Sequence, residues 1–241
     1  MLIKNHGGLM KKGFTLAEVL ITLGIIGVVA ALTLPVLFQN YQEQEIVAKA
    51  KKDYSLLAQA LQLAQADFDT PGDNSSLYLY ANNAPTTLAK AFSKYISGGQ
   101  LCLNNSSEPS CADLPYKLEF SDYKNGYGKN FNGPAIKLPD GGIVFFSISE
   151  AHCEDTEMSG VLLDENGDIR YNEDGSPSMW HGIRNNCGNI YFDVNGSKKP
   201  NKFGQDAFGF GVYKNNIGNT DWMSAYGDAY LKNILKFGKR K

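Results

Sequence analysis

The sequence lacks a strong charge of either sign, repeated apolar spans and a dense set of cysteines. Its formal net charge of −2 provides no overall basic field for nucleic acid. A mean hydropathy of −0.29 excludes several membrane spans, and four cysteines in 241 residues exclude a disulfide-dense miniprotein. No P-loop, Gly-x-Ser-x-Gly, His-Glu-x-x-His or paired-carboxylate motif stands out, so we expect no enzyme. The composition indicates one ordinary globular domain with an appendage.

Nearly all of the long apolar sequence lies in the first 40 residues. Residues 1–13 are polar and carry three lysines but no acid. From Val19 to Phe38 the run is interrupted only by Thr22, Gly24, Gly27, Thr33 and Pro35. At 1.5 Å per residue, a helix of about 20 residues reaches the roughly 30 Å of a hydrocarbon core. The preceding lysines predict that this end stays in the cytoplasm and that the rest of the chain lies outside.

Three interpretations of this segment compete. An ordinary signal peptide would be cleaved near Val28, Ala30 and Ala31, whereas a signal anchor would keep the whole chain. The third interpretation places the cut at Gly13–Phe14 and keeps the apolar run. A carboxylate at Glu18 costs about 2.5–3.5 kcal/mol deep in a bilayer, and a removable signal gains nothing from it. The simpler explanation is that Glu18 favours the positive end of the helix dipole.

Residues 11–35 read KKGFTLAEVLITLGIIGVVAALTLP. This segment resembles the N-terminus of type IV pilins and of the pseudopilins of type II secretion systems. That family has a short basic leader, a Gly, an apolar residue that is often Phe, then Thr, Leu, any residue and Glu, followed by an apolar helix. The matching residues here are Lys11, Lys12, Gly13, Phe14, Thr15, Leu16, Ala17 and Glu18, and Pro35 falls where the family commonly has a proline.

The resemblance implies a prepilin peptidase that cuts after Gly13 and methylates the new amino terminus of Phe14. It also implies a subunit that spans the inner membrane with its head in the periplasm. From there the subunit enters a periplasmic or cell-surface filament whose apolar helices pack together. Glu18 lies one turn from Phe14 on the same helix face, and its counterpart in the family pairs with the amino terminus of an adjacent subunit. Because an unpaired charge there is expensive, the pair would fix the register between neighbours.

The helical pattern continues beyond the apolar run. Apolar residues recur at alternating spacings of three and four, which predicts a helix to about Phe68: Val47, Ala50, Tyr54, Leu57, Leu61, Ala64 and Phe68. Charged residues, Asp53 among them, are expected on the other faces. The helix should be bent or loosened near Gly24, Gly27 and Pro35. The expected segments are a leader at 1–13, a membrane and filament-core helix at 14–38, an amphipathic stem helix at 39–69 and a head at 70–241.

The head is expected to contain short strands and turns. Thr86 or Thr87 should cap a short helix that ends before Gly98. Turn residues predict hairpins between 135–138 and 143–148 and between 161–163 and 169–171, with further strands at 189–193 and 207–213. An antiparallel sheet packed on the apolar stripe of the stem follows, which is an α+β, pilin-like fold.

The four cysteines allow three pairings. A head outside the inner membrane lies in an oxidising compartment, and proximity favours Cys102–Cys111 and Cys153–Cys187. A zinc or thiol site would have to use His152, Cys153, His181 and Cys187. Adjacent His152 and Cys153 point in different directions on any regular element, and no Cys-x-x-Cys or His-x-x-x-His spacing occurs, so disulfides are favoured.

A calcium site is an open alternative at the loop Asp193-Val194-Asn195-Gly196 and the later Asp206. No EF-hand fits, because Gly at position six and Glu at position twelve are missing. Some pseudopilins hold calcium in a C-terminal loop, so Asp193, Asn195 and Asp206 are kept as candidate ligands. The alternative is that these residues only form turns. The basic segment 231–241 could contact phosphate, yet such tails are usually solvated, and no nucleic-acid partner is expected.

The sequence therefore favours a structural protein, a minor pilin or pseudopilin whose partners are like subunits, the prepilin peptidase and the inner membrane. Many major pilins close their last strands with a C-terminal disulfide loop, whereas 54 residues follow Cys187 here. That difference favours a minor pilin or a pseudopilin. The alternative function is an exported binding protein with an ordinary signal peptide.

Overall fold

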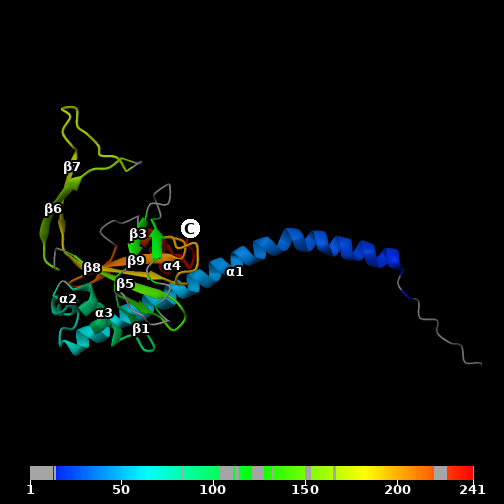
Figure 1. Ribbon diagram of the computed structural model, residues 1–241, viewed down its shortest axis with the longest axis horizontal. Helices are drawn as coiled ribbons and strands as arrows, with labels where there is room; N and C mark the ends of the chain where they lie inside the picture. Colours follow the sequence, from blue (N-terminus) through cyan, green and yellow to red (C-terminus); the bar gives the residue numbers. More distant parts are fainter. Residues whose placement is uncertain are drawn as a thin grey trace, which may run out of the picture. The chain divides into compact units, whose positions relative to one another are not determined.

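The computed structural model describes most of the chain and divides it into two compact units, residues 1–44 and 45–241. The fold class is α+β, with a long N-terminal helix and an antiparallel sheet (Figure 1). The described residues are 13, 15–82, 84–103, 111, 114, 116–120, 128–131, 133–149, 153–164, 167–219 and 227–240.

Helix α1 (Leu16–Asp67) has 52 residues and is helical throughout, Pro35 included. The first unit holds its residues up to Gln44, and the second unit holds the rest. In the second unit the predicted stripe is buried at Val47, Ala50, Leu57, Leu61 and Ala64, and Tyr54 and Phe68 are partly buried. One expectation about this helix is wrong: Asp53 does not lie on a solvent face but is 0% exposed.

Three shorter helices complete the helical part. Helix α3 (Pro85–Ser93) corresponds to the predicted short helix, but its N-cap is Ala84 rather than a threonine. Pro85 replaces the expected cap signal, because its fixed φ suits the first helical position and its missing N–H is not needed there. Helices α2 (Ser75–Tyr80) and α4 (Asp228–Phe237) were not predicted. The basic tail thus forms an amphipathic helix that buries Leu231 and Ile234.

The central sheet has six strands in the order β1-β4-β5-β8-β9-β10, and every neighbouring pair is antiparallel. Four of these strands match the strands expected from the sequence. The strand bounds are β1 (Gln100–Cys102), β4 (Ala135–Lys137), β5 (Ile143–Ile148), β8 (Asn186–Asp193), β9 (Ala207–Tyr213) and β10 (Ile217–Gly218).

Alternate residues of this sheet enter two different cores. Val144, Ile190 and Phe192 face the core formed with the helices, whereas Phe145 and Tyr191 face the hairpin of β2 (Tyr116–Glu119) and β3 (Gly128–Phe131). This two-residue period follows from the pleat of the strands. Strand β8 is buried at every position, because the sheet is covered on both faces. The result is three layers: helices, central sheet and hairpin.

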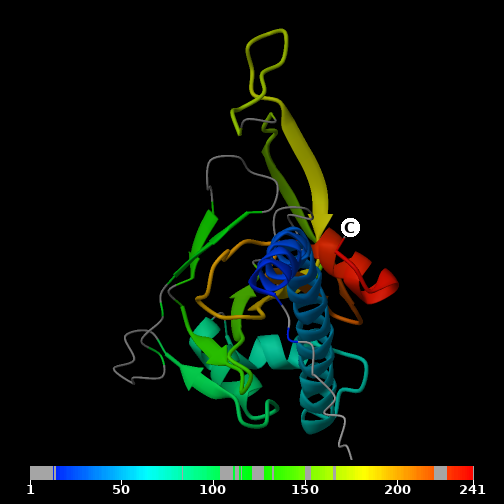
Figure 2. The ribbon, with the colours of Figure 1, turned by 90° about the vertical axis from the view of Figure 1, so that its right-hand side faces the viewer.

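A separate two-stranded ribbon is formed by β6 (Thr156–Val161) and β7 (Met179–Arg184). The expected hairpin between 161–163 and 169–171 is reduced to an isolated bridge, Leu163 with Ile169. Its Asn166 lies outside the described residues. The sequence signal missed the main ladder because residues 179–184 contain no alternation of apolar and polar side chains. Figure 2 shows the ribbon extending from the body of the head.

Disulfide bonds join Cys102 to Cys111 and Cys153 to Cys187, the pairing that proximity favours. All four sulfurs are therefore bonded, and no thiolate is present for a metal or a nucleophile. His152 lies outside the described residues. The bond between Cys153 and Cys187 joins the two ends of the ribbon, and Cys187 is fully buried in β8. The ribbon is thereby fixed to the central sheet.

Candidate functional site

Helix α1 begins with a reciprocal cap between Thr15 and Glu18. One carboxylate oxygen of Glu18, Oε2, accepts hydrogen bonds from the Thr15 amide and the Thr15 hydroxyl, each at 2.8 Å. The Thr15 hydroxyl oxygen in turn accepts the Glu18 amide at 3.3 Å. This is a capping box, for which Thr-x-x-Glu is the sequence signal. This second role of Glu18 was not predicted from the sequence.

The cap uses only one oxygen of Glu18. The other oxygen, Oε1, has no partner among the described residues. Gly13 is exposed, and Phe14, the residue expected to carry the new amino terminus, lies outside the described residues. The carboxylate is therefore held in the first turn of α1 with one oxygen available to a cation.

The helix surface that follows is apolar and uncovered. In α1 the large side chains from Val19 to Phe38 are exposed, and Leu32 reaches 72%. The hydroxyls of Thr22 and Thr33 donate to backbone carbonyls of the preceding turn, so they leave no unpaired polar group on this surface. By length and composition, α1 is able to cross a membrane. An exposed apolar surface of this size is typical of a segment that contacts lipid or other apolar helices.

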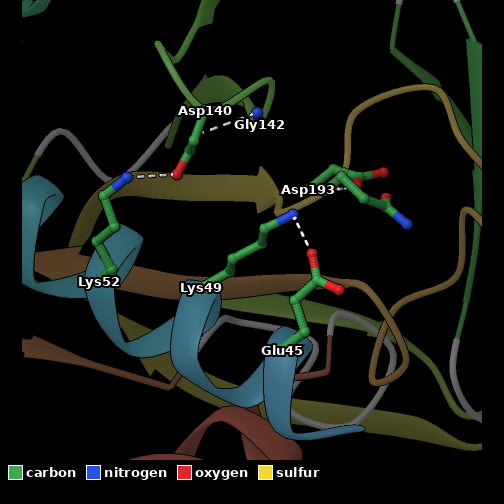
Figure 3. A network of polar contacts seen from close by, with 7 residues as sticks. Glu45, Lys49, Lys52, Asp140, Gly142 and Asp193 are labelled. Carbon is green, nitrogen blue, oxygen red and sulfur yellow. Dashed lines mark hydrogen bonds and ion pairs between the residues drawn. The ribbon is translucent and has the colours of Figure 1, made fainter. Parts of the chain in front are cut away.

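In the second unit, α1 carries charged residues beside the turn between β4 and β5 (Figure 3). Lys52 pairs with Asp140 at 2.6 Å, and the other oxygen of Asp140 accepts the Gly142 amide at 3.3 Å. Partial burial acts to raise the pKa of Asp140, but the Lys52 hydrogen bond and the Gly142 amide hold that pKa below its ordinary value. Glu45 and Lys49 form an ion pair at 2.9 Å on the same helix.

Asp53 lies beneath this turn. Both of its carboxylate oxygens are buried, and neither has a hydrogen-bond partner among the described residues. A Cβ added to Gly142 would lie 3.3 Å from Oδ2 of Asp53, so the turn closes tightly over the carboxyl. Burial raises the pKa of Asp53 to about 7, and the charge of Asp140 adds to the increase. Near neutral pH the head therefore contains a carboxyl group that ionises only at a cost.

The calcium candidates Asp193, Asn195 and Asp206 lie together at the end of β8. The Asp193 carboxylate accepts the Asn195 amide and the Tyr116 hydroxyl, each at 3.1 Å. The Asp206 carboxylate accepts the amides of Asn201 and Lys202 at 2.9 and 2.8 Å. Both aspartates thus organise turns. Burial raises the pKa of Asp193, to which the charge of Asp206 contributes, and burial likewise raises the pKa of Asp206.

An oxygen-only donor set of this kind is chemically suited to calcium. The side-chain oxygens of Asn195 and Asn201 are buried without a partner, although no group of three acidic, His or Cys residues is gathered in the described part of the chain. Calcium at this loop stays a prediction. In a calcium titration of the full chain, binding would raise the melting temperature, and Asp206→Asn would abolish the rise. A melting temperature independent of calcium would contradict it.

Comparison with known families bears on the N-terminal segment alone. Residues 9–34 match the family profile described as the prokaryotic N-terminal methylation motif. This segment is the type IV pilin and pseudopilin signature. The pilin-type segment covers the Thr15–Glu18 cap and most of the apolar run, but ends before Pro35. Comparisons with curated proteins and with solved structures found no match to the chain.

The pilin-type motif supports a pilin-like or pseudopilin-like subunit, and the proteins that carry it are structural rather than catalytic. Such subunits generally assemble with others of their kind after processing by a prepilin peptidase. Together, the motif and the apolar part of α1 fit a membrane-anchored precursor.

Proposed function

We propose that this chain is a structural subunit, a minor pilin or a pseudopilin, of a type IV pilus or type II secretion filament. It is cleaved after Gly13, methylated on the amine of Phe14 and assembled through α1. The observation that carries this proposal is the position of the motif directly before an uncovered apolar helix surface. Before assembly the head lies in the periplasm and α1 spans the inner membrane; afterwards the filament is periplasmic or on the cell surface.

The physics of α1 supports assembly through helix packing. When α1 moves from lipid into a bundle of like helices, the hydrophobic effect gives no net gain in free energy, because lipid tails are as apolar as leucine. Close packing and polar pairs must then provide the specificity. Gly24 and Gly27 have open space where a side chain would be, so neighbouring helices can approach there. Pro35 has no amide hydrogen, so the carbonyl four residues earlier lacks its usual helical partner.

Glu18 provides the polar pair in this proposal. Cleavage after Gly13 removes the lysines of the leader and creates an amine at Phe14. The free Oε1 of Glu18 accepts the amine of an adjacent subunit while Oε2 keeps the helix capped. In a low-dielectric bundle a cation and a carboxylate that fail to meet are each costly, so only one register is favourable.

The elements that follow Cys187 support a minor pilin or a pseudopilin. After Cys187 the chain continues through β9, β10 and α4, and no disulfide closes this part. Measuring whether the subunit occurs along a purified filament or only at its tip would separate a repeating subunit from a minor one.

Mass spectrometry of the mature N-terminus tests the proposed processing. We expect the chain to begin at Phe14 and to carry one additional methyl group on its amine. A matched variant, Gly13→Leu, should keep residues 1–13, because a bulky side chain then precedes the cleaved bond. A wild-type chain that retains residues 1–13 would contradict the proposal. A start near Ala31 would favour the exported binding protein.

A further inference from the structure

Segment 154–184, which consists of the ribbon with its tip and two flanking residues, combines strong negative charge with exposed apolar side chains. It contains eight acidic and two basic residues, although the whole chain has a net charge of only −2. Paired residues of an antiparallel ribbon share a face. Val161 pairs with Met179, and Glu157 pairs with Ile183 on the same face.

This face of the ribbon is open. Val161 is 39% exposed and Met179 is 45% exposed. On the opposite face Trp180 packs over Gly160, where a Cβ would lie 2.8 Å from the indole nitrogen. On the Trp180 face, therefore, a side chain of the ribbon packs against the ribbon itself, whereas no described residue covers the Val161 face. Since the disulfide fixes the base of the ribbon, its apolar face is presented without a large loss of chain entropy.

Helix α4 offers a surface of complementary character. An apolar groove of about 380 Å³ lies between α4 and the edge of the central sheet. Its apolar floor comes from Tyr54, Phe210, Ile217, Leu231 and Leu235, and its rim carries Lys232 and Lys236. Among the side chains that the structure describes, neither lysine forms an ion pair, and Nζ of Lys236 lies 5.0 Å from the centroid of the Phe237 ring. Segment 228–241 has five basic residues and one acid.

We propose that the apolar face of the ribbon of one subunit binds the α4 groove of a second copy of this chain. The acidic ribbon meets the lysine rim, and Val161 and Met179 cover the groove floor. Two different surfaces make this contact, so it is heterologous and can repeat along an open helical assembly. The inference rests on the proposed filament and adds a contact between heads to the packing of α1. Charge complementarity fixes the orientation more than the affinity.

Cross-linking in the assembled, full-length protein tests this contact. Met179→Cys and Leu235→Cys are placed in separate copies that carry different tags, so that a mixed-tag product reports a contact between chains. We expect an oxidised mixed dimer in the filament fraction. The control replaces Met179→Cys with Leu79→Cys, a more accessible position on α2 (62% against 45% exposed) that should give no mixed dimer.

Charge reversal provides a second measurement that leaves the cores intact. Lys232→Glu with Lys236→Glu should lower the mixed-dimer yield about tenfold, because like charges then face each other. Adding Glu157→Lys to the copy that carries Met179→Cys should then raise the mixed-dimer yield several-fold. The lysines and Glu157 are exposed, so folding should not change.

The outcomes separate the two proposals. Filaments of processed subunits that give no mixed dimer, or a mixed dimer that is insensitive to charge reversal, overturn the ribbon contact and leave the proposed function intact. A chain that is neither processed nor assembled overturns both. A mixed-dimer yield that falls when the two lysines are reversed and recovers with Glu157→Lys supports the ribbon contact.

Discussion

Glu18→Gln is expected to reduce the recovery of this subunit in filaments by about 100-fold or more. The side-chain oxygen of the glutamine can still accept the hydrogen bonds from the Thr15 amide and hydroxyl, so the helix cap is kept. It cannot neutralise the amine of a neighbouring subunit, and removing one partner of a buried ion pair costs about 3–5 kcal/mol. Each 1.4 kcal/mol is about a factor of ten in an equilibrium. Quantifying the sedimented filament fraction against total subunit measures the effect.

Thr15→Ala is the matched control for Glu18. It removes the hydroxyl of the capping box but leaves the carboxylate charge in place. Loss of a cap costs about 1 kcal/mol, so the reduction in filaments should be only about fivefold. Mass spectrometry must show the same mature N-terminus for each variant. Wild-type filament yields from Glu18→Gln would mean that Glu18 acts as a helix cap and not as a partner of the amine.

Asp53→Asn is expected to stabilise the head at pH 8 by about 2–4 kcal/mol. In the folded head the pKa of Asp53 is raised to about 7, whereas an aspartate in an unfolded chain titrates near 3.9. At pH 8 the wild-type protein must bury a carboxylate without a hydrogen bond. Asparagine has almost the same shape and no charge, so this electrostatic cost disappears. Guanidinium denaturation of the full chain in detergent, followed by near-ultraviolet circular dichroism, measures the change.

The pH dependence has a definite sign. Between about pH 4 and pH 7 the folded head binds a proton on Asp53 that the unfolded chain has lost. The free energy of unfolding therefore falls as the pH rises through this range and is constant above it. Asp193 and Asp206 also have raised pKa values and act in the same direction. Asp140, with its lowered pKa, stabilises the head above its ordinary pKa instead.

The control for Asp53 is Asp67→Asn, an exposed carboxylate on the same helix. The free energy of unfolding of Asp67→Asn should differ from that of the wild type by less than about 0.5 kcal/mol at pH 8, because the asparagine oxygen can still accept the Tyr95 hydroxyl. Asp53→Asn should also flatten the decline of stability between pH 4 and pH 7. An unchanged slope would show that folding does not raise the pKa of Asp53, and a less stable variant at pH 8 would show that the folded head stabilises the ionised carboxylate.

Short-range sequence signals were sufficient wherever local chemistry dominates. The apolar run, the Thr-Leu-Ala-Glu start of α1 and the stripe from Val47 to Ala64 follow directly from helical periodicity. Strands β5 and β9 were predictable because turn residues flank apolar runs. The disulfide pairing agreed with proximity, since each pair closes a nearby segment of the chain.

The ribbon and α4 were not predicted from the sequence. Segment 179–184 pairs with 156–161 across a long tip, a non-local pairing that no local pattern specifies. The basic tail was expected to be solvated because its charges dominate its composition. This tail forms helix α4 because Leu231 and Ile234 are buried when α4 packs against β9.

The sequence by itself determined that this protein has a pilin-type N-terminus, one apolar helix and an α+β head, because these depend on the order and spacing of neighbouring residues. The tertiary structure alone decided that Asp53 is buried without a partner and that the ribbon and the α4 groove are uncovered. Burial and exposure are set by residues that come together from distant parts of the chain. The free-energy cost of a charge on a helix face can be judged only when the turn that covers it is known.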